Sequence, residues 1–139
     1  MINKELVINK MADIQKYLEE MAPILKYEAR EIIDDNLKLH TVERLFQLIV
    51  AAAIDINTHI IIETELNVPD DYQSTFMTLG EHKILAMDFA VAIAPSVGLR
   101  NLIIHKYGKV DIKKMVDDIK NNIGQYKEYL ENIAEFLKK

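Results

Sequence analysis

The chain has 139 residues, half of them hydrophobic, and no cysteine; this composition suits one domain with a sizeable core and excludes disulfides, thiolate metal sites and cysteine nucleophiles. The net charge of −5 argues against a strong sequence-independent nucleic-acid binder, so DNA is not expected as a partner. No signal peptide or membrane span is expected, because no long apolar run is free of polar residues, and the protein is predicted to be cytoplasmic.

The N-terminal part of the chain predicts two long helices. Apolar residues at spacings of three, four and seven over residues 4–35 indicate an amphipathic helix, which Pro23 should kink or split. The sequence DDNLKLH should form the turn that follows. Residues 41–66 are apolar on most of their circumference and predict a central helix, which would be about 40 Å long at 1.5 Å per residue.

A short helix and a fourth long one should come next. Asp70 or Asp71 can cap the short helix, whose sequence is DYQSTFMTL. Thr78 and Glu81 have the spacing of a capping box and predict the start of the fourth helix. A proline and a glycine at positions 95 and 98 should disturb this helix, and Gly108 should end it.

The last predicted helix covers residues 112–137, with Asp111 as its cap. Together these elements predict an all-α protein with a single domain over residues 1–139. The expected architecture is an up-and-down bundle of four main helices plus one short helix.

The candidate functional residues lie in the sequence GLRNLIIHKYG, at positions 98–108. Arg100, His105 and Tyr107 fall in the most basic part of the chain, since residues 100–114 hold five Lys or Arg and one acid. On an ideal helix, side chains five residues apart point about 140° away from each other, so Arg100 and His105 do not share a face. A helix end, a kink or a cleft shared by two subunits of a symmetric dimer could bring them together.

An Arg and a His suit the chemistry of a phosphodiester. Arginine binds phosphate oxygens with a permanently charged fork, and histidine can transfer a proton near neutral pH. In RNA the neighbouring 2′-OH is a built-in nucleophile, so that no metal is required. The spacing alone favours a simpler interpretation, in which His105 caps a helix C-terminus and Arg100 lies on a solvated face.

A second polar pattern lies in the predicted central helix. Asp55, His59 and Glu63 follow one another at intervals of four residues, which puts them on one face and resembles a metal cluster. A polar stripe on a long helix accounts for the same spacing and is the favoured interpretation. No metal or other cofactor is expected.

The sequence RNLIIHKY, preceded by Gly-Leu and followed by a short loop and a terminal helix, resembles the signature of HepT-type toxins of the HEPN superfamily. The upstream sequences ERLFQLIVAAAIDINTHII and DYQSTFMTLGEHKIL are similar to the second helix and the following short helix of that family. The resemblance covers about residues 4–135.

This resemblance implies a ribonuclease toxin of a type VII toxin–antitoxin module, encoded beside a minimal nucleotidyltransferase antitoxin. Arg100 and His105 match the RNA-cleaving residues of the family, and Asn101 matches the polar residue after the arginine. Lys106 adds positive charge. Tyr107 matches the tyrosine that the antitoxin modifies with AMP, and members of the superfamily dimerise so that two motifs form one cleft.

We therefore predict a metal-independent endoribonuclease toxin that acts as a homodimer on an RNA substrate and is silenced by its antitoxin. Arg100 would hold the phosphate, and His105 would transfer protons. Asn101 would orient the phosphate or His105, and Lys106 would contact RNA. Tyr107 would line the cleft and accept AMP. The alternative function is a non-catalytic module that binds a nucleotide or a partner and regulates a nucleotidyltransferase.

Overall fold

A computed structural model describes residues 1–105 and 110–139 of the chain. The described residues are helical and contain no strand, which confirms the predicted all-α class. The helices are α1 (Lys4–Leu25), α2 (Ala29–Ile33), α3 (Asn36–Glu63), α4 (Gln73–Glu81), α5 (Met87–Ile93), α6 (Ser96–His105), α7 (Ile112–Asn122) and α8 (Gln125–Leu137).

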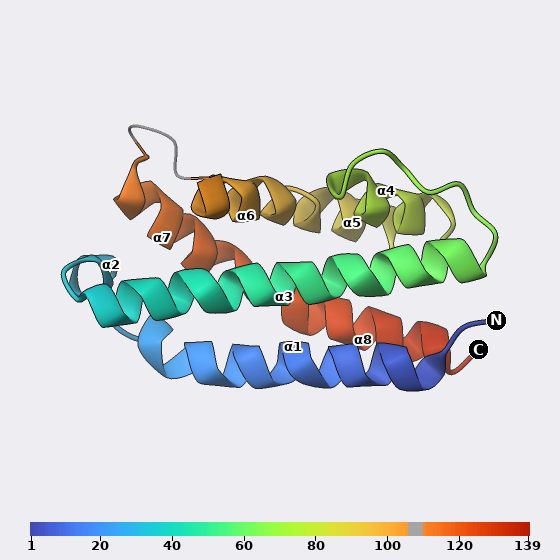
Figure 1. Cartoon of the computed structure of the whole chain (residues 1–139), viewed down its shortest axis with the longest axis horizontal. Coiled ribbons are helices and arrows are strands. Elements are labelled where there is room, and N and C mark those ends of the chain that lie inside the picture. Colours follow the sequence, from blue (N-terminus) through green and yellow to red (C-terminus); the bar gives the residue numbers. More distant parts are fainter. Residues whose placement is uncertain (106–109) are drawn as a thin grey trace.

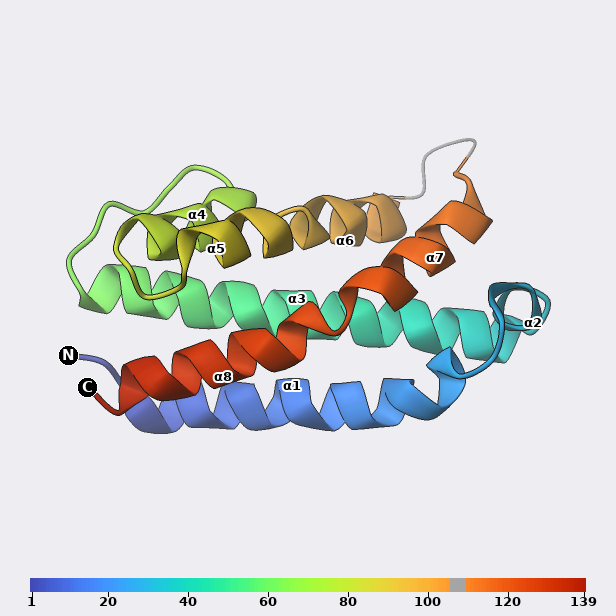
Figure 2. The same cartoon turned by 180° about the vertical axis from the view of Figure 1, so that it is seen from behind.

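The bundle is built around α3, which runs along the length of the molecule (Figure 1). Helices α1 and α8 lie side by side along one flank of α3 (Figures 1 and 2). Along the opposite flank α5 and α6 follow one another, and α4 packs beside α5. The two termini lie near each other at one end of the bundle. This arrangement agrees with the predicted helical bundle and places the motif helix α6 beside α3.

Helix α3 begins earlier than its apolar pattern predicts. The side chain of Asp35 accepts hydrogen bonds from the backbone N–H groups of Leu37 and Lys38, at 3.0 and 3.2 Å, and caps the helix at Asn36. Most of DDNLKLH is therefore helix rather than the predicted turn, because an aspartate at this position satisfies the free N–H groups of the first turn.

Two helical stretches are long and apolar enough to cross a membrane by length and composition, namely α3 and the residues Met87–His105 of α5 and α6. Of the most apolar window of α3, 61% is buried inside the bundle. Its buried residues cover a broad arc, more than half of the helix circumference, as expected for the central element of a helical core.

The predicted capping box at Thr78 is wrong. Thr78 lies inside α4, where its hydroxyl donates to the backbone oxygen of Ser74 at 3.0 Å, and α4 ends at Glu81. Asp71, one of the two aspartates predicted to cap the short helix, is placed to do so, since its carboxylate accepts from the backbone N–H of Ser74 at 2.8 Å. The helix therefore begins before the threonine is reached.

Prolines and a glycine divide the longer predicted helices. Pro23 lies in the last turn of α1, and the chain becomes helical again only at α2. Pro95 separates α5 from α6, which confirms the predicted disturbance. The predicted cap Asp111 accepts from the backbone N–H of Lys114 at 3.0 Å, but the terminal helix is broken at Gly124 into α7 and α8. Gly108 lies outside the described residues.

Candidate active site

The motif helix α6 is fixed to the bundle at its first residue. The hydroxyl of Ser96 shares a buried hydrogen bond of 2.6 Å with the hydroxyl of Tyr126 on α8. Val97 and Ile103 are buried on the inner face of α6, whereas Leu102 and Ile104 are each 43% exposed. Helix α6 therefore has one face packed in the core, and large apolar side chains are still exposed on both sides of that face.

Arg100 lines a groove between α6 and α3 with a volume of about 450 Å³. Its Nη1 donates to Oδ1 of Asn101 at 3.2 Å, and its buried Nε has no hydrogen-bond acceptor among the described residues. Buried donors are nearly always satisfied in native proteins, so this guanidinium is suited to an acceptor that enters the groove. The other lining residues are Ala51, Ile54, Asp55, Thr58, His59, Ile62 and Tyr72.

The polar stripe of α3 forms the opposite wall of this groove and continues past it. Asp55 forms a salt bridge of 3.1 Å with Lys10, and Nε2 of His59 accepts from the backbone N–H of Asn3 at 3.0 Å. Glu63 accepts from the amino group of Met1 at 2.7 Å. Because each polar group of the stripe has a partner in the N-terminal segment, these contacts agree with the favoured interpretation as a polar stripe.

His105 is the last residue of α6, and its side chain is exposed. Arg100 and His105 thus lie on one helix, about 140° apart around its axis. His105 is not among the described residues that line the Arg100 groove. One chain therefore brings Arg100 and Asn101 together and leaves His105 on another side of the same helix. Lys106 and Tyr107 lie outside the described residues.

The basic stretch around the motif is partly neutralised within α7. Nζ of Lys113 lies 2.8 Å from the Asp117 carboxylate, and Nζ of Lys114 lies 3.0 Å from the Asp118 carboxylate. Hydrogen bonding to these aspartates raises the pKa of both lysines. Lys113 and Lys114 therefore offer less positive charge to a ligand than the count of basic residues over 100–114 suggests.

A second hollow, of about 360 Å³, shares Tyr72 with the groove of Arg100 and is lined by Asn101 as well. Its other lining residues are Asp70, Asp71, Gln73 and Val97. Hydrogen bonds from the backbone and hydroxyl of Ser74 lower the pKa of the Asp71 carboxyl. Sequence reasoning did not single out Tyr72, because its position beside the motif results from the packing of α4 near α6.

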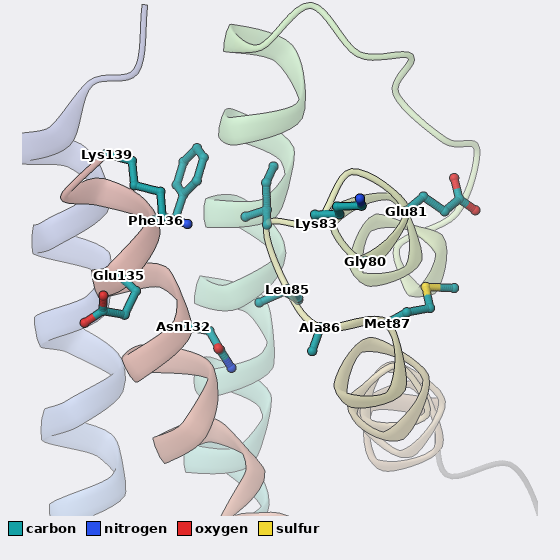
Figure 3. A pocket seen from close by; sticks show the side chains of 11 residues that line it. Gly80, Glu81, Lys83, Leu85, Ala86, Met87, Asn132, Glu135, Phe136 and Lys139 are labelled. Carbon is teal, nitrogen blue, oxygen red and sulfur yellow. The ribbon is translucent and has the colours of Figure 1, made fainter.

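A more spacious hollow, of about 690 Å³, lies elsewhere, between the α4–α5 connection and the end of α8 (Figure 3). Figure 3 shows Lys83 and Leu85 of that connection on one side, with Asn132, Phe136 and Lys139 on the other. None of the motif residues that the structure describes lines it. The size of a hollow therefore does not locate the candidate site in this protein.

The sequence matches the family model described as ribonuclease HepT-like over residues 14–133. A tRNA nuclease HepT of Aphanizomenon flos-aquae is 32% identical over 99% of this chain and 95% of its own length. An mRNA nuclease HepT of Shewanella oneidensis is 22% identical over 93% of this chain and 96% of its own length. Two relatives with different RNA classes in their names thus align with nearly the whole chain.

The fold is also found among solved structures. A tri-AMPylated HEPN toxin of Shewanella oneidensis, in complex with MNT antitoxin, superposes with a TM-score of 0.85 at 21% sequence identity. The match covers 94% of this chain and 97% of that chain. The family model and the relatives agree on nucleases that act on RNA, which confirms the predicted enzyme class, a ribonuclease. The chain belongs to the ribonuclease HepT-like family.

Proposed function

We propose that this protein is the toxin of a toxin–antitoxin module and cleaves RNA internally, without a metal ion, at a site that two subunits share. The observation that carries this proposal is the arrangement of α6. Arg100 lines the α3–α6 groove with a buried donor that has no acceptor in the described part of the chain, while His105 lies on another side of the same helix. In a symmetric dimer, a second copy of α6 can place its own His105 near the Arg100 of the first copy.

The proposed reaction needs only proton transfer and charge stabilisation. The imidazole of His105 removes the proton of the 2′-OH, and the 2′-oxygen attacks the neighbouring phosphorus. His105 of the second subunit donates a proton to the leaving 5′-oxygen, so that a cyclic phosphate and a free 5′-hydroxyl result. Arg100 holds the non-bridging oxygens as charge develops on them, and Asn101 restrains the guanidinium through its hydrogen bond. Lys106 adds positive charge for the RNA backbone.

The outer face of α6 supports a symmetric homodimer. Leu102 and Ile104 lie on either side of His105 around the axis of α6, and each is 43% exposed. Exposed large apolar side chains mark a candidate interface, and pairing through the face that carries His105 would cover one of them on each side of it. Pairing of two α6 helices through this face would bury these side chains and bring the two copies of His105 near the shared axis.

The first prediction concerns His105. Replacing His105 by Ala should lower RNA cleavage in the presence of EDTA by at least about 100-fold, because proton transfer contributes that much or more. The matched control is His82→Ala, which removes another exposed histidine, at the end of α4 and away from the motif helix. Equal cleavage by the wild type and His105→Ala, or no cleavage by either, would contradict the proposed activity.

The second prediction concerns silencing by the antitoxin. The related solved toxin is AMPylated and bound to MNT antitoxin, and we assign the corresponding modification here to Tyr107. An AMP group would add negative charge to the basic motif and so oppose the binding of RNA phosphates. Incubation with ATP and the nucleotidyltransferase should increase the intact mass of the wild type and of Tyr27→Phe. The assignment fails if Tyr107→Phe gains the same mass.

The alternative is a non-catalytic module that binds a nucleotide or partner protein through the same groove. Growth separates the two functions, because only a ribonuclease should arrest cells when it is produced without its partner. Arrest by the wild type and normal growth with His105→Ala would support the enzyme. Since cellular RNA is the proposed target, the site of action is the cytoplasm.

A further inference from the structure

Tyr72 stands between the two hollows that adjoin the motif. Its side chain is 56% exposed, although it belongs to the residues that line the groove of Arg100. The same residue lines the smaller hollow, which contains Asn101. The exposed Tyr72 thus lines both hollows, of which one is lined by Arg100 and the other by Asn101.

The backbone of Tyr72 is tied to the core by a chain of hydrogen bonds. The hydroxyl of Tyr129 donates to Oδ1 of Asn57 at 2.6 Å, and Nδ2 of Asn57 donates to the hydroxyl of Thr75 at 3.2 Å. That hydroxyl donates in turn to the backbone oxygen of Tyr72 at 2.6 Å. Tyr129, Asn57 and Thr75 are buried. The ring is therefore exposed on a backbone that helices α3, α4 and α8 hold in place, as a preformed binding surface requires.

The two hollows differ in chemistry. The groove presents the guanidinium of Arg100, while the salt bridge with Lys10 offsets the charge of Asp55. The smaller hollow presents carboxylates and amides, which are contributed by Asp70, Asp71, Gln73 and Asn101. Carboxylates repel phosphate but accept hydrogen bonds from the amino groups of bases, and amides bind base edges. One hollow thus suits a phosphate and the other suits a base.

We propose that Tyr72 and the smaller hollow form a nucleobase subsite for single-stranded RNA, with the adjoining phosphate at Arg100. The base stacks on the exposed ring, and its hydrogen-bonding edge faces Asp70, Gln73 and Asn101. Stacking on an aromatic side chain is available to every base, whereas the carboxylates favour bases with an exocyclic amino group over uracil. This inference rests on the proposed ribonuclease function, for which it names a determinant of specificity.

The chain has no tryptophan, so Tyr72→Trp provides a single fluorescent reporter of binding. In a His105→Ala background, which prevents cleavage, a short oligocytidylate should strongly quench the fluorescence of the introduced indole. An oligouridylate of equal length should do so only at higher concentration. Tyr27→Trp, at another exposed tyrosine between α1 and α2, is the matched control and should show no saturable quenching. Absence of quenching at position 72, or equal quenching at both positions, overturns the subsite.

Cleavage kinetics give an independent test. Tyr72→Ala should lower kcat/KM about 10-fold or more, since loss of stacking on one base costs roughly 1–3 kcal/mol, while Tyr72→Phe should keep most activity because it retains a ring. Circular dichroism checks that each variant is folded. If RNA quenches the indole at position 72 but the wild type cleaves no RNA, the subsite is supported and the proposed ribonuclease activity is contradicted. Cleavage that Tyr72→Ala leaves unchanged contradicts the subsite alone.

Discussion

At the scale of single residues, two buried tyrosines of α8 connect the motif to the core. Tyr126 bonds to Ser96 at the start of α6, and Tyr129 bonds to Asn57 of α3. Their rings pack edge to face, with centroids 6.0 Å apart, and Phe76 packs against Tyr129 in the same way. The phenols thus provide both packing and satisfied polar groups inside the bundle.

These phenols should make the protein sensitive to alkaline pH. Burial raises the pKa of both Tyr126 and Tyr129, because an apolar interior disfavours the charged form. Their contribution to stability is present in full below the unfolded pKa of about 10 and is lost as the pH rises above it. We therefore expect the tyrosinate absorbance of these two residues to appear only as the helical signal disappears.

Replacing Tyr126 by Phe serves as the control for that titration. The variant should lose one of the two late-ionising groups while keeping the exposed tyrosines unchanged. If all six tyrosines of the wild type ionise while its circular dichroism spectrum remains native, the burial of Tyr126 and Tyr129 is contradicted.

At the scale of helices, α4 and α5 approach each other closely at Gly80. A Cβ atom there would lie 2.8 Å from Cβ of Ala90 and 2.8 Å from Sδ of Met87. Figure 3 shows Gly80 and Met87 where the connection between the two helices turns. The methionine can move, but the alanine can move only with its helix, so this glycine sets the distance between α4 and α5.

Gly80→Ala should therefore destabilise the protein by about 1–3 kcal/mol, the usual cost of overpacking. The measurement is the midpoint of urea unfolding followed by circular dichroism. Gly124→Ala is the matched control, because no atom lies within 4 Å of its added Cβ and its backbone is already helical; it should be neutral or slightly stabilising. Equal midpoints for both variants would contradict the close packing of α4 on α5.

Elements that are determined by residues close together in the sequence were predicted correctly, whereas features that depend on tertiary packing were not. Periodicity predicted the amphipathic first helix and the central α3, and the cap at Asp111 follows from its own side chain. Thr78 has the spacing of a capping box, yet it lies inside α4, and the next helix, α5, begins only at Met87. The motif residues Arg100 and His105 were found because they lie on one continuous segment. Tyr72 was not, because it lies 28 positions before Arg100 along the chain.

At the scale of the whole molecule, the fold presents α6 on a flank of the bundle, with exposed residues on its outer face. Asp55, the acidic residue of α3 that lines the Arg100 groove, forms a salt bridge with Lys10. Arg100 therefore keeps its charge available in a protein with a net charge of −5. In the proposed reaction each subunit contributes one His105, so a second chain is required to complete the site.

Mixing the wild type with an inactive variant tests this central claim most directly. A fixed amount of wild type is unfolded and refolded together with a roughly tenfold excess of His105→Ala, so that random pairing places most wild-type chains in mixed dimers. The account predicts that RNA cleavage falls to about one-tenth of that of the wild type refolded alone, because a mixed dimer holds one His105 where the reaction uses two. The same two proteins, refolded separately and then combined, control for competition for RNA. Undiminished cleavage, with mixed dimers present by native mass spectrometry, would contradict a site shared between subunits.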